Sequence, residues 1–112
     1  KVFMKRVIKS ERRVDGGCKK YLLKYKLVSN EFSKEEGKGK YYGIIIEQFT
    51  WSEIKEEWEF YDKAQVQGFS ESLKETMLFF ERIVKGDVLP VSLNDIVDDW
   101  RSAFCQENRE SA

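Results

Sequence analysis

The sequence predicts an α+β fold, in which an antiparallel sheet of about four strands is followed by two C-terminal helices packed on one face of the sheet. Strand-like segments separated by turn residues fill roughly residues 2–66, and helical periodicity begins only after Gly68. Two helices, expected at roughly 71–85 and 93–105, each carry an apolar stripe that neither can bury alone. Because the length of 112 residues is typical of one domain, we expect a single domain.

Apolar residues recur every three or four positions in both helical segments. The first stripe is Leu73, Thr76, Met77, Phe80, Ile83 and Val84, and the second is Leu93, Ile96, Val97, Trp100 and Phe104. Ser72 with Glu75, and Ser92 with Asp95, have the spacing of a capping box and predict where each helix begins. Gly86 is expected to be the left-handed residue that ends the first helix.

The first half begins with a predicted hairpin. Residues 2–14 and 18–29 are expected to be its strands, and Asp15-Gly16-Gly17 predicts the tight turn, because glycine adopts positive φ without strain. Side chains alternate between the two faces of a strand. One face of the return strand takes Tyr21, Leu23, Tyr25 and Leu27, and the other takes Lys20, Lys24 and Lys26 with Leu22 and Val28. One face is therefore apolar and the other largely basic.

The register of this hairpin stays open between two alternatives. A two-residue turn places Arg13 opposite Lys20 and Lys9 opposite Lys24, whereas a three-residue turn places Arg12 opposite Lys20. Both alternatives oppose like charges, which destabilises a strand pair. We interpret that repulsion as a hint that an anionic partner binds this face.

The middle of the chain predicts a loop and then a central strand. Residues 30–39 are polar and glycine-containing and are expected to form a loop. Residues 40–49 are expected to be a strand in the middle of the sheet, because three successive isoleucines starting at Ile44 suit burial on both faces. Gly43 indicates a bulge or a close approach by a neighbouring strand.

Residues 50–66 allow two interpretations. Trp51, Ile54, Trp58 and Tyr61 recur at helical spacing, whereas Ile54, Trp58 and Phe60 share the parity of a strand. We prefer a turn near residues 52–55 followed by a strand over residues 57–66, because short hairpins are the commonest connection between successive strands.

Charge is distributed unevenly although the net charge is zero. Residues 1–40 hold 13 Lys and Arg against 5 Asp and Glu, and residues 41–112 hold 7 against 15. This polarity suggests an interaction face or head-to-tail attraction between molecules, and the alternative is that each half simply solvates its own surface.

The two cysteines favour a reducing, cytoplasmic location. Cys18 and Cys105 are far apart and lack metal-site spacing, whereas a small secreted chain usually carries several cysteine pairs. A single disulfide between them stays open as an alternative. The sequence has no signal-peptide pattern and no apolar run of membrane-spanning length, so no membrane partner is expected. The chain begins with Lys1, which leaves the native start open, with Met4 as one candidate.

Two segments resemble a family of small uncharacterised bacterial proteins. The first is Tyr42-Gly43-Ile44-Ile45-Ile46-Glu47. In the second, residues 88–100, the family's Pro-x-x-Leu-x-Asp-Val-Val-Glu-Asp pattern is matched at Pro90, Leu93, Asp95, Val97 and Asp99, with near substitutions at Ile96 and Asp98. The resemblance covers roughly residues 7–104. It implies a compact cytosolic protein and brings no known activity, cofactor or catalytic residue.

The composition argues against an enzyme. The chain has no histidine, which removes the commonest general base, the Ser/His and Cys/His nucleophile pairs, and most catalytic zinc sites. Asp95, Asp98 and Asp99 share one helical face and could attract a hard cation, but acidic residues near a helix start are also favoured by the helix dipole. We therefore expect no catalytic residue, metal site or cofactor, and keep an enzyme or metal-binding protein using clustered carboxylates as an alternative.

The basic hairpin is a candidate site for RNA or another polyanion. Its cations are Arg12, Arg13, Lys19, Lys20, Lys24 and Lys26. Together with the nearby tyrosines they could hold phosphates and stack bases, although Tyr21 and Tyr25 share a face with leucines and suit core packing better. Nucleic-acid binding is therefore the alternative function.

Tryptophans favour a protein interface. Trp100 is expected in the core, whereas Trp51 and Trp58 are candidates for an exposed contact surface. With the uneven charge, they favour a non-catalytic protein-interaction module that binds a protein partner or itself, with a homodimer expected.

Overall fold

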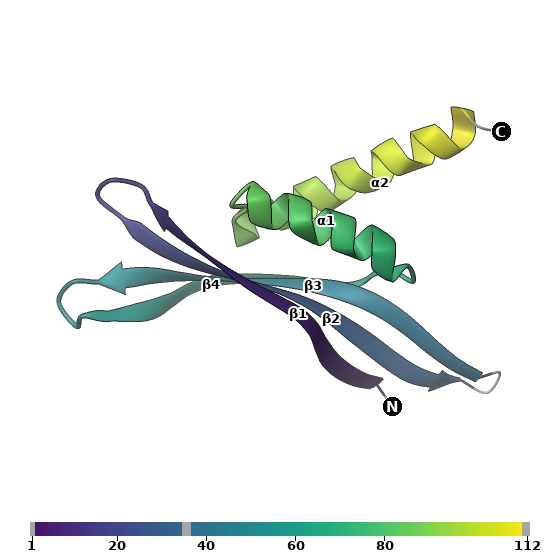
Figure 1. Ribbon diagram of the computed structural model, residues 1–112, viewed down its shortest axis with the longest axis horizontal. Helices are drawn as coiled ribbons and strands as arrows, with labels where there is room; N and C mark the ends of the chain where they lie inside the picture. Colours follow the sequence, from purple (N-terminus) through teal and green to yellow (C-terminus); the bar gives the residue numbers. More distant parts are fainter. Residues whose placement is uncertain (1, 35–36, 111–112) are drawn as a thin grey trace.

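A four-stranded antiparallel sheet and two helices over one of its faces form two layers (Figure 1). The computed structural model describes the backbone of residues 2–34 and 37–110 and the side chains of residues 5–31 and 39–103. The elements are β1 (Val2–Asp15), β2 (Lys20–Lys34), β3 (Gly37–Ser52), β4 (Glu57–Ser70), α1 (Leu73–Lys85), the 3-10 helix η1 (Pro90–Ser92) and α2 (Leu93–Glu110). The strands lie side by side in sequence order. The predicted α+β class is confirmed.

The strands are longer than the sequence predicts. The prediction of a loop at residues 30–39 is wrong, because β2 continues to Lys34 and β3 begins at Gly37. Cross-strand pairing outweighs the low strand propensity of this segment: Glu31 lies opposite Lys40, and their side chains form an ion pair of 3.5 Å. The preferred interpretation of residues 50–66 is confirmed, since a turn separates β3 from β4, which then runs on through Gly68 at φ +61°.

The first hairpin has neither predicted register. Its loop contains residues 16–19, so that Asp15 lies opposite Lys20 and Glu11 lies opposite Lys24. The side chain of Asp15 sets this longer turn by accepting a hydrogen bond of 3.1 Å from the Gly17 amide, with Gly17 at φ +86°. The register thus pairs opposite charges at positions where we expected repulsion.

One like-charged pair remains, Lys9 opposite Lys26. Each has an acidic neighbour: Lys9 lies 3.3 Å from Glu11, and Lys26 lies 2.6 Å from Glu47. The expected repulsion is therefore largely neutralised within the molecule, and it does not argue for an anionic partner.

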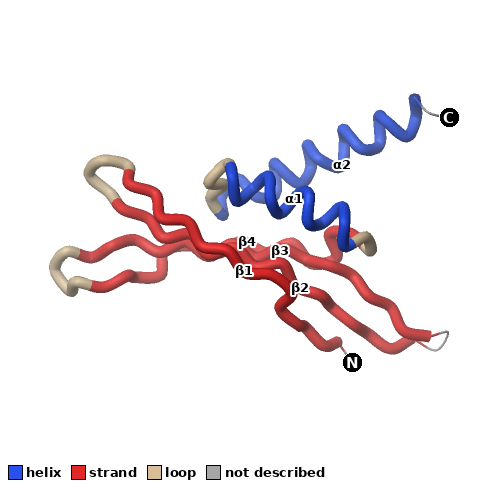
Figure 2. The backbone as a smooth tube through the Cα atoms, viewed as in Figure 1, coloured by secondary structure: helices blue, strands red, loops and turns tan. Residues whose placement is uncertain are grey.

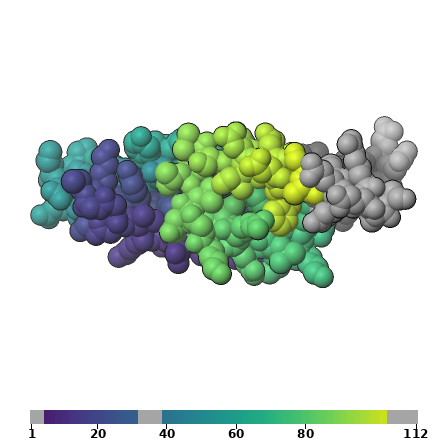
Figure 3. All heavy atoms as spheres, turned by 90° about the horizontal axis from the view of Figure 1, so that it is seen from above, coloured from purple at the N-terminus to yellow at the C-terminus, as the bar shows by residue number. Residues whose placement is uncertain are grey.

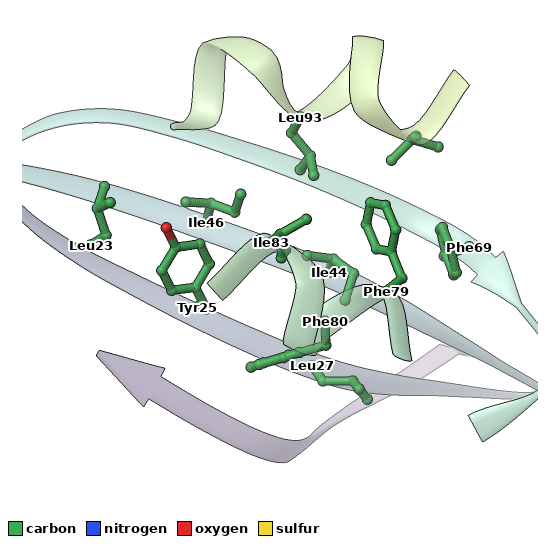
Figure 4. Close-up of a cluster of buried hydrophobic side chains, with 11 residues drawn as sticks. Leu23, Tyr25, Leu27, Ile44, Ile46, Phe69, Phe79, Phe80, Ile83 and Leu93 are labelled. Carbon is green, nitrogen blue, oxygen red and sulfur yellow. The ribbon is translucent and has the colours of Figure 1, made fainter. Parts of the chain in front are cut away.

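The hydrophobic core lies between the sheet and the helices (Figure 4). Its buried members are Leu23, Tyr25, Leu27, Ile44, Ile46, Phe69, Phe79, Phe80, Ile83, Leu93 and Val97. The predicted helical stripes supply most of its helical part, with Trp100 half-buried against it and the Phe104 side chain outside the described residues. Phe79 was missed: it is fully buried, stacked on Phe69 at 4.6 Å, whereas the predicted Leu73 is exposed.

The start of α1 carries an extended version of the predicted cap. The Ser72 hydroxyl accepts a hydrogen bond of 3.1 Å from the Glu75 amide, as expected. The Ser72 amide, however, donates to the Ser70 hydroxyl at 3.0 Å, and that hydroxyl donates to Glu75 Oε2 at 2.8 Å. Ser70 therefore relays the interaction that a capping box makes directly.

The end of α1 corrects the prediction for Gly86, which has φ −87°. Asp87 takes the left-handed conformation instead, at φ 50°. The amides of Asp87 and Val88 donate to the carbonyls of Val84 and Ile83, both at 3.1 Å, which is the Schellman pattern. Asp is one of the few residues besides glycine that adopt this conformation. Its side chain forms an ion pair of 2.8 Å with Arg12 of β1, which is far away in the sequence.

The second helical segment begins at Pro90 as a 3-10 turn that continues into α2. Ser92 therefore lies inside the helical segment, and the predicted cap at Ser92 is wrong. Pro90 suits the first helical position, where its missing N–H has no intrahelical partner in any case. The Ser92 amide donates to the Leu89 carbonyl at 3.0 Å.

The helices cover only part of the sheet. Figure 2 shows the β1–β2 and β3–β4 hairpins projecting together beyond the helices at one end, and Figure 3 shows the same end bare from above. The molecule is thin for its breadth, with extents of 54 × 37 × 17 Å. One whole face of the sheet and both projecting hairpins are therefore free of any described covering element (Figure 1).

Candidate functional site

The sheet face that points away from the helices carries apolar side chains. Leu22, Val28 and Ile45 alternate with the core residues of β2 and β3 and so lie on this uncovered face. They are only 3–7 % exposed, although no described helix or strand covers them. The prediction that β3 is central is confirmed, but the expected second covering layer is absent from the described part of the chain, and neighbouring side chains shield this face instead.

Four aromatic residues, Phe49, Trp51, Trp58 and Phe60, form what we call the aromatic patch at the hairpin end of the uncovered face. The register places Trp51 opposite Trp58 and Phe49 opposite Phe60. The ring centroids of the Trp pair lie 5.3 Å apart and those of the Phe pair 5.9 Å apart, both edge to face. Phe60 is 60 % exposed and Trp51 is 36 % exposed. The structure thus joins the two predicted interface residues in one cross-strand pair.

Phe49 and Phe60 were not predicted as interface residues. A signal for them existed, since Phe49 and Phe60 are spaced symmetrically about the same turn as Trp51 and Trp58. A hairpin centred on residues 53–56 makes both pairs direct cross-strand neighbours, and such aromatic pairs stabilise a sheet.

The six cations of the predicted polyanion site do not share one surface. Arg12 lies opposite the core residue Leu23, on the helix-covered face, and its guanidinium is held by Asp87; this hydrogen bond raises the pKa of Arg12. Lys26 is paired with Glu47, and Lys24 Nζ lies 5.0 Å above the ring of Phe49. Three of the six cations therefore already have partners within the molecule.

The other three, Arg13, Lys19 and Lys20, lie exposed at the projecting hairpin. A hollow of about 590 Å³ separates this hairpin from the end of β3–β4, and its lining is Arg13, Val14, Asp15, Lys20, Tyr21, Trp51 and Trp58. The hollow thus joins two of the predicted anion-binding residues to both predicted interface tryptophans. Asp15 adds a negative charge to the same wall.

The core tyrosine Tyr25 ties the sheet to the loop after α1. Its hydroxyl donates a hydrogen bond of 2.8 Å to the Val88 carbonyl, and its side chain has no exposed surface. Burial, followed by the negative charge of Asp87, raises the pKa of Tyr25 well above its ordinary value. Tyr25 therefore has a structural role, in line with its placement among leucines.

The remaining candidates are three aspartates of α2 and the two cysteines. Asp95, Asp98 and Asp99 are all exposed, and the side chains that the structure describes contain no group of three or more residues arranged to hold a metal ion. Cys18 is free and exposed at the first hairpin, at the opposite end of the molecule from the C-terminus of α2 (Figure 1). The side chain of Cys105, like that of Met4, lies outside the described residues.

A protein-family model matches nearly the whole chain. A family of unknown function, DUF6514, matches residues 4–103. The chain belongs to this family. The match agrees with the resemblance to an uncharacterised family noted from the sequence. No curated protein and no solved structure matches the chain. Among the described helices of this DUF6514 member, none is both long and apolar enough to cross a membrane.

Proposed function

We propose that this DUF6514 protein is a non-catalytic interaction module that forms a homodimer through the uncovered face of its sheet. The observation that supports the proposal is the aromatic patch, in which Trp51, Trp58, Phe49 and Phe60 lie side by side and partly exposed. Large aromatic side chains at the surface are enriched in protein interfaces, where one apolar body gives much contact area at low entropic cost.

Face-to-face sheet packing is the geometry that suits this surface. Two sheets pack about 10 Å apart with interdigitating side chains, so a second copy related by a two-fold axis would give the uncovered face a partner layer. A standard interface buries about 800 Å² per partner, and a molecule 54 Å by 37 Å in its broad directions has room for that area. Leu22 and Ile45, already shielded from water, would extend the apolar contact beside the patch.

The cellular setting follows from the composition. Two distant cysteines suit a reducing cytoplasm, and the lack of histidine suits a role without catalysis, metal or cofactor. A bacterial origin is what the resemblance to the uncharacterised family implies.

The test is light scattering on a size-exclusion column at low and high salt, after nucleic acid has been removed. We expect a dimer at both salt concentrations, because apolar burial is insensitive to ionic strength compared with surface charge. Phe60→Lys is expected to give a monomer. The matched control is Leu78→Lys, which changes an exposed apolar residue of similar exposure, 53 % against 60 %, on α1 and therefore away from the uncovered face. A wild-type monomer at both salts, or equal effects of the two variants, would contradict the proposal.

Polyanion binding is the second candidate, and the hollow between the hairpins favours it. Arg13 and Lys20 stand beside Trp51 and Trp58 there, which is the combination of cation and stacking surface that single strands use. Titration of a fluorescein-labelled oligothymidine tests it. Binding should weaken steeply with salt and disappear in Arg13→Glu combined with Lys20→Glu, whereas Lys63→Glu, an exposed charge on β4 outside the hollow, should leave binding unchanged. Salt-insensitive binding, or none, excludes this candidate.

A further inference from the structure

β1 offers an open edge for another strand. It is the outer strand of the sheet, paired with β2 on one side, and no described element pairs with its other side. Alternate residues of such an edge point their N–H and C=O groups outward, where an added strand can bond to them. Pairing with β2 is regular from Ile8 to Asp15, beyond the register shift at Val7, so this stretch is the straight part of the edge.

A groove lies beside that open edge, between β1 and α1. Its volume is about 410 Å³, within the range of sites that hold ligands. The lining residues are Ile8, Lys9, Ser10, Arg12, Met77, Phe80, Glu81, Val84 and Lys85. Phe80 is buried and Ile8, Met77 and Val84 are half-buried, so the floor is apolar. The groove is therefore a place where an apolar side chain can sit next to an available strand edge.

The unpaired positive charge at the groove comes from Lys85. The groove is also lined by Lys9, Arg12 and Glu81. The Arg12 guanidinium is held by Asp87, and Lys9, which lies opposite Lys26 on the uncovered face, is paired with Glu11. Lys85 has no ion-pair partner among the side chains that the structure describes. Along β1, Lys5, Arg6 and Arg13 are exposed, and Arg6 and Arg13 lie opposite Val28 and Leu22 on the uncovered side of the strand. A strand added at this edge would therefore have mostly basic neighbours on β1 and an apolar floor in the groove.

We propose that this groove binds an extended acidic peptide segment of another protein. The segment adds a fifth strand next to β1, seats an apolar side chain against Phe80 and Met77, and places a carboxylate near Lys85. This is the peptide-recognition mode in which main-chain hydrogen bonds to a sheet edge give affinity and a neighbouring pocket gives specificity. The charge disfavours a second copy as occupant through the same strand, because β1 against β1 would bring lysines and arginines together.

The experiment is selection of a phage-displayed library of random peptides on the full chain. We expect the enriched peptides to share a bulky apolar residue flanked by Asp or Glu. Ser10→Phe should abolish binding of an enriched peptide, measured by fluorescence anisotropy, because the added ring fills the groove. Lys85→Glu should weaken binding about fivefold, from loss of one charge pair, whereas Lys74→Glu, the same charge change on the exposed side of α1, should leave binding unchanged.

A second readout tests strand addition. Hydrogen exchange of the β1 amides should slow when the peptide binds, which a ligand held only by side chains would not cause. Circular dichroism of each variant checks folding, and Lys85→Glu keeps the test valid if Ser10→Phe perturbs the fold. Several results would overturn the proposal: no enrichment, peptides without acidic residues, binding unaffected by Lys85→Glu, or equal competition by heparin, which would indicate a polyanion site instead.

The groove and the aromatic patch share no residue. Phe60→Lys should therefore leave peptide binding intact even if it removes the dimer. Failure of the groove proposal and failure of the dimer proposal are thus distinguishable.

Discussion

The two faces of this sheet carry similar side chains but have different coverings. Ile44 and Ile46 on the covered face have no exposed surface and pack against α1 and α2, whereas Ile45 between them is 5 % exposed and faces away from both helices. Leu23 and Leu22 repeat the same contrast on β2. Low exposure therefore arises in two ways, from a second layer on one face and from neighbouring side chains on the other.

The two ways of shielding a side chain have different consequences for the free energy of unfolding. A covered position loses its packing partners when a side chain is truncated, because the surrounding layer relaxes only partly and leaves a cavity. A position shielded only by neighbouring side chains can be refilled by those side chains or by water. Unless a partner covers the second face, its apolar residues contribute less to stability than those under the helices, and they remain free to act in binding.

The largest effect is expected from truncation of adjacent isoleucines on opposite faces. Ile46→Ala should lower the free energy of unfolding by about 3–4 kcal/mol, because a cavity forms under the helices. Ile45→Ala should lower it by only about 1–2 kcal/mol, since the apolar surface is lost but neighbouring side chains or water can refill the site. Urea denaturation followed by circular dichroism measures both.

The effect of protein concentration on these two variants tests whether a second copy covers Ile45. If it does, the loss of unfolding free energy caused by Ile45→Ala should increase as the protein concentration rises above the dimer dissociation constant, whereas the loss caused by Ile46→Ala should stay the same. Equal costs at every concentration would mean that the two faces do not differ in packing, and the comparison would be wrong.

Substitution of Tyr25, on the covered face, is expected to have an intermediate and pH-dependent effect on stability. Tyr25→Phe should lower the free energy of unfolding by about 1–2 kcal/mol at neutral pH, because the Val88 carbonyl loses its hydrogen-bond donor. Burial raises the pKa of Tyr25 in the folded protein, so the protonated phenol contributes its full stability below pH 10. Above pH 10 the Tyr25 phenol ionises in the unfolded chain but stays protonated in the folded protein. The difference in unfolding free energy between the wild type and the variant should therefore shrink by about 1 kcal/mol per pH unit.

The measurement is urea denaturation of both proteins between pH 8 and pH 11. The remaining tyrosines are common to both chains and cancel in the difference. An advantage that is constant across this range would show that Tyr25 titrates normally, and hence that it is not buried as described.

Much of the fold was predictable because periodicity and turn chemistry are local. The alternation of Leu23, Tyr25 and Leu27, the cap at Ser72 and the close approach at Gly43 were all visible in the sequence. At Gly43 an added Cβ would lie 2.6 Å from the Val66 carbonyl oxygen, so only glycine fits beside the register shift between β3 and β4.

The parts that were not predictable depend on contacts between distant segments. The left-handed residue after α1 is Asp87 rather than Gly86, because Arg12, far away in the sequence, supplies an ion pair. The hairpin register depends on the side chain of Asp15, and the added strand length in residues 30–39 depends on pairing with β3. For the candidate surfaces, the sequence identified Trp51 and Trp58 but could not show that Arg12 lies on the covered face.

The smallest effect is expected within the aromatic patch itself. Trp51→Ala and Trp58→Ala, made singly and together, form a double-mutant cycle on the uncovered face, and the coupling free energy should be about 0.5–1.5 kcal/mol, as for other edge-to-face aromatic pairs. Measured below the dimer dissociation constant, this value reports the cross-strand pair alone. Measured above it, each single variant should also lose dimer contacts, so its cost should rise with protein concentration. Costs that stay constant with concentration would show that nothing packs on the patch, and they would leave Trp51 and Trp58 as partners of each other only.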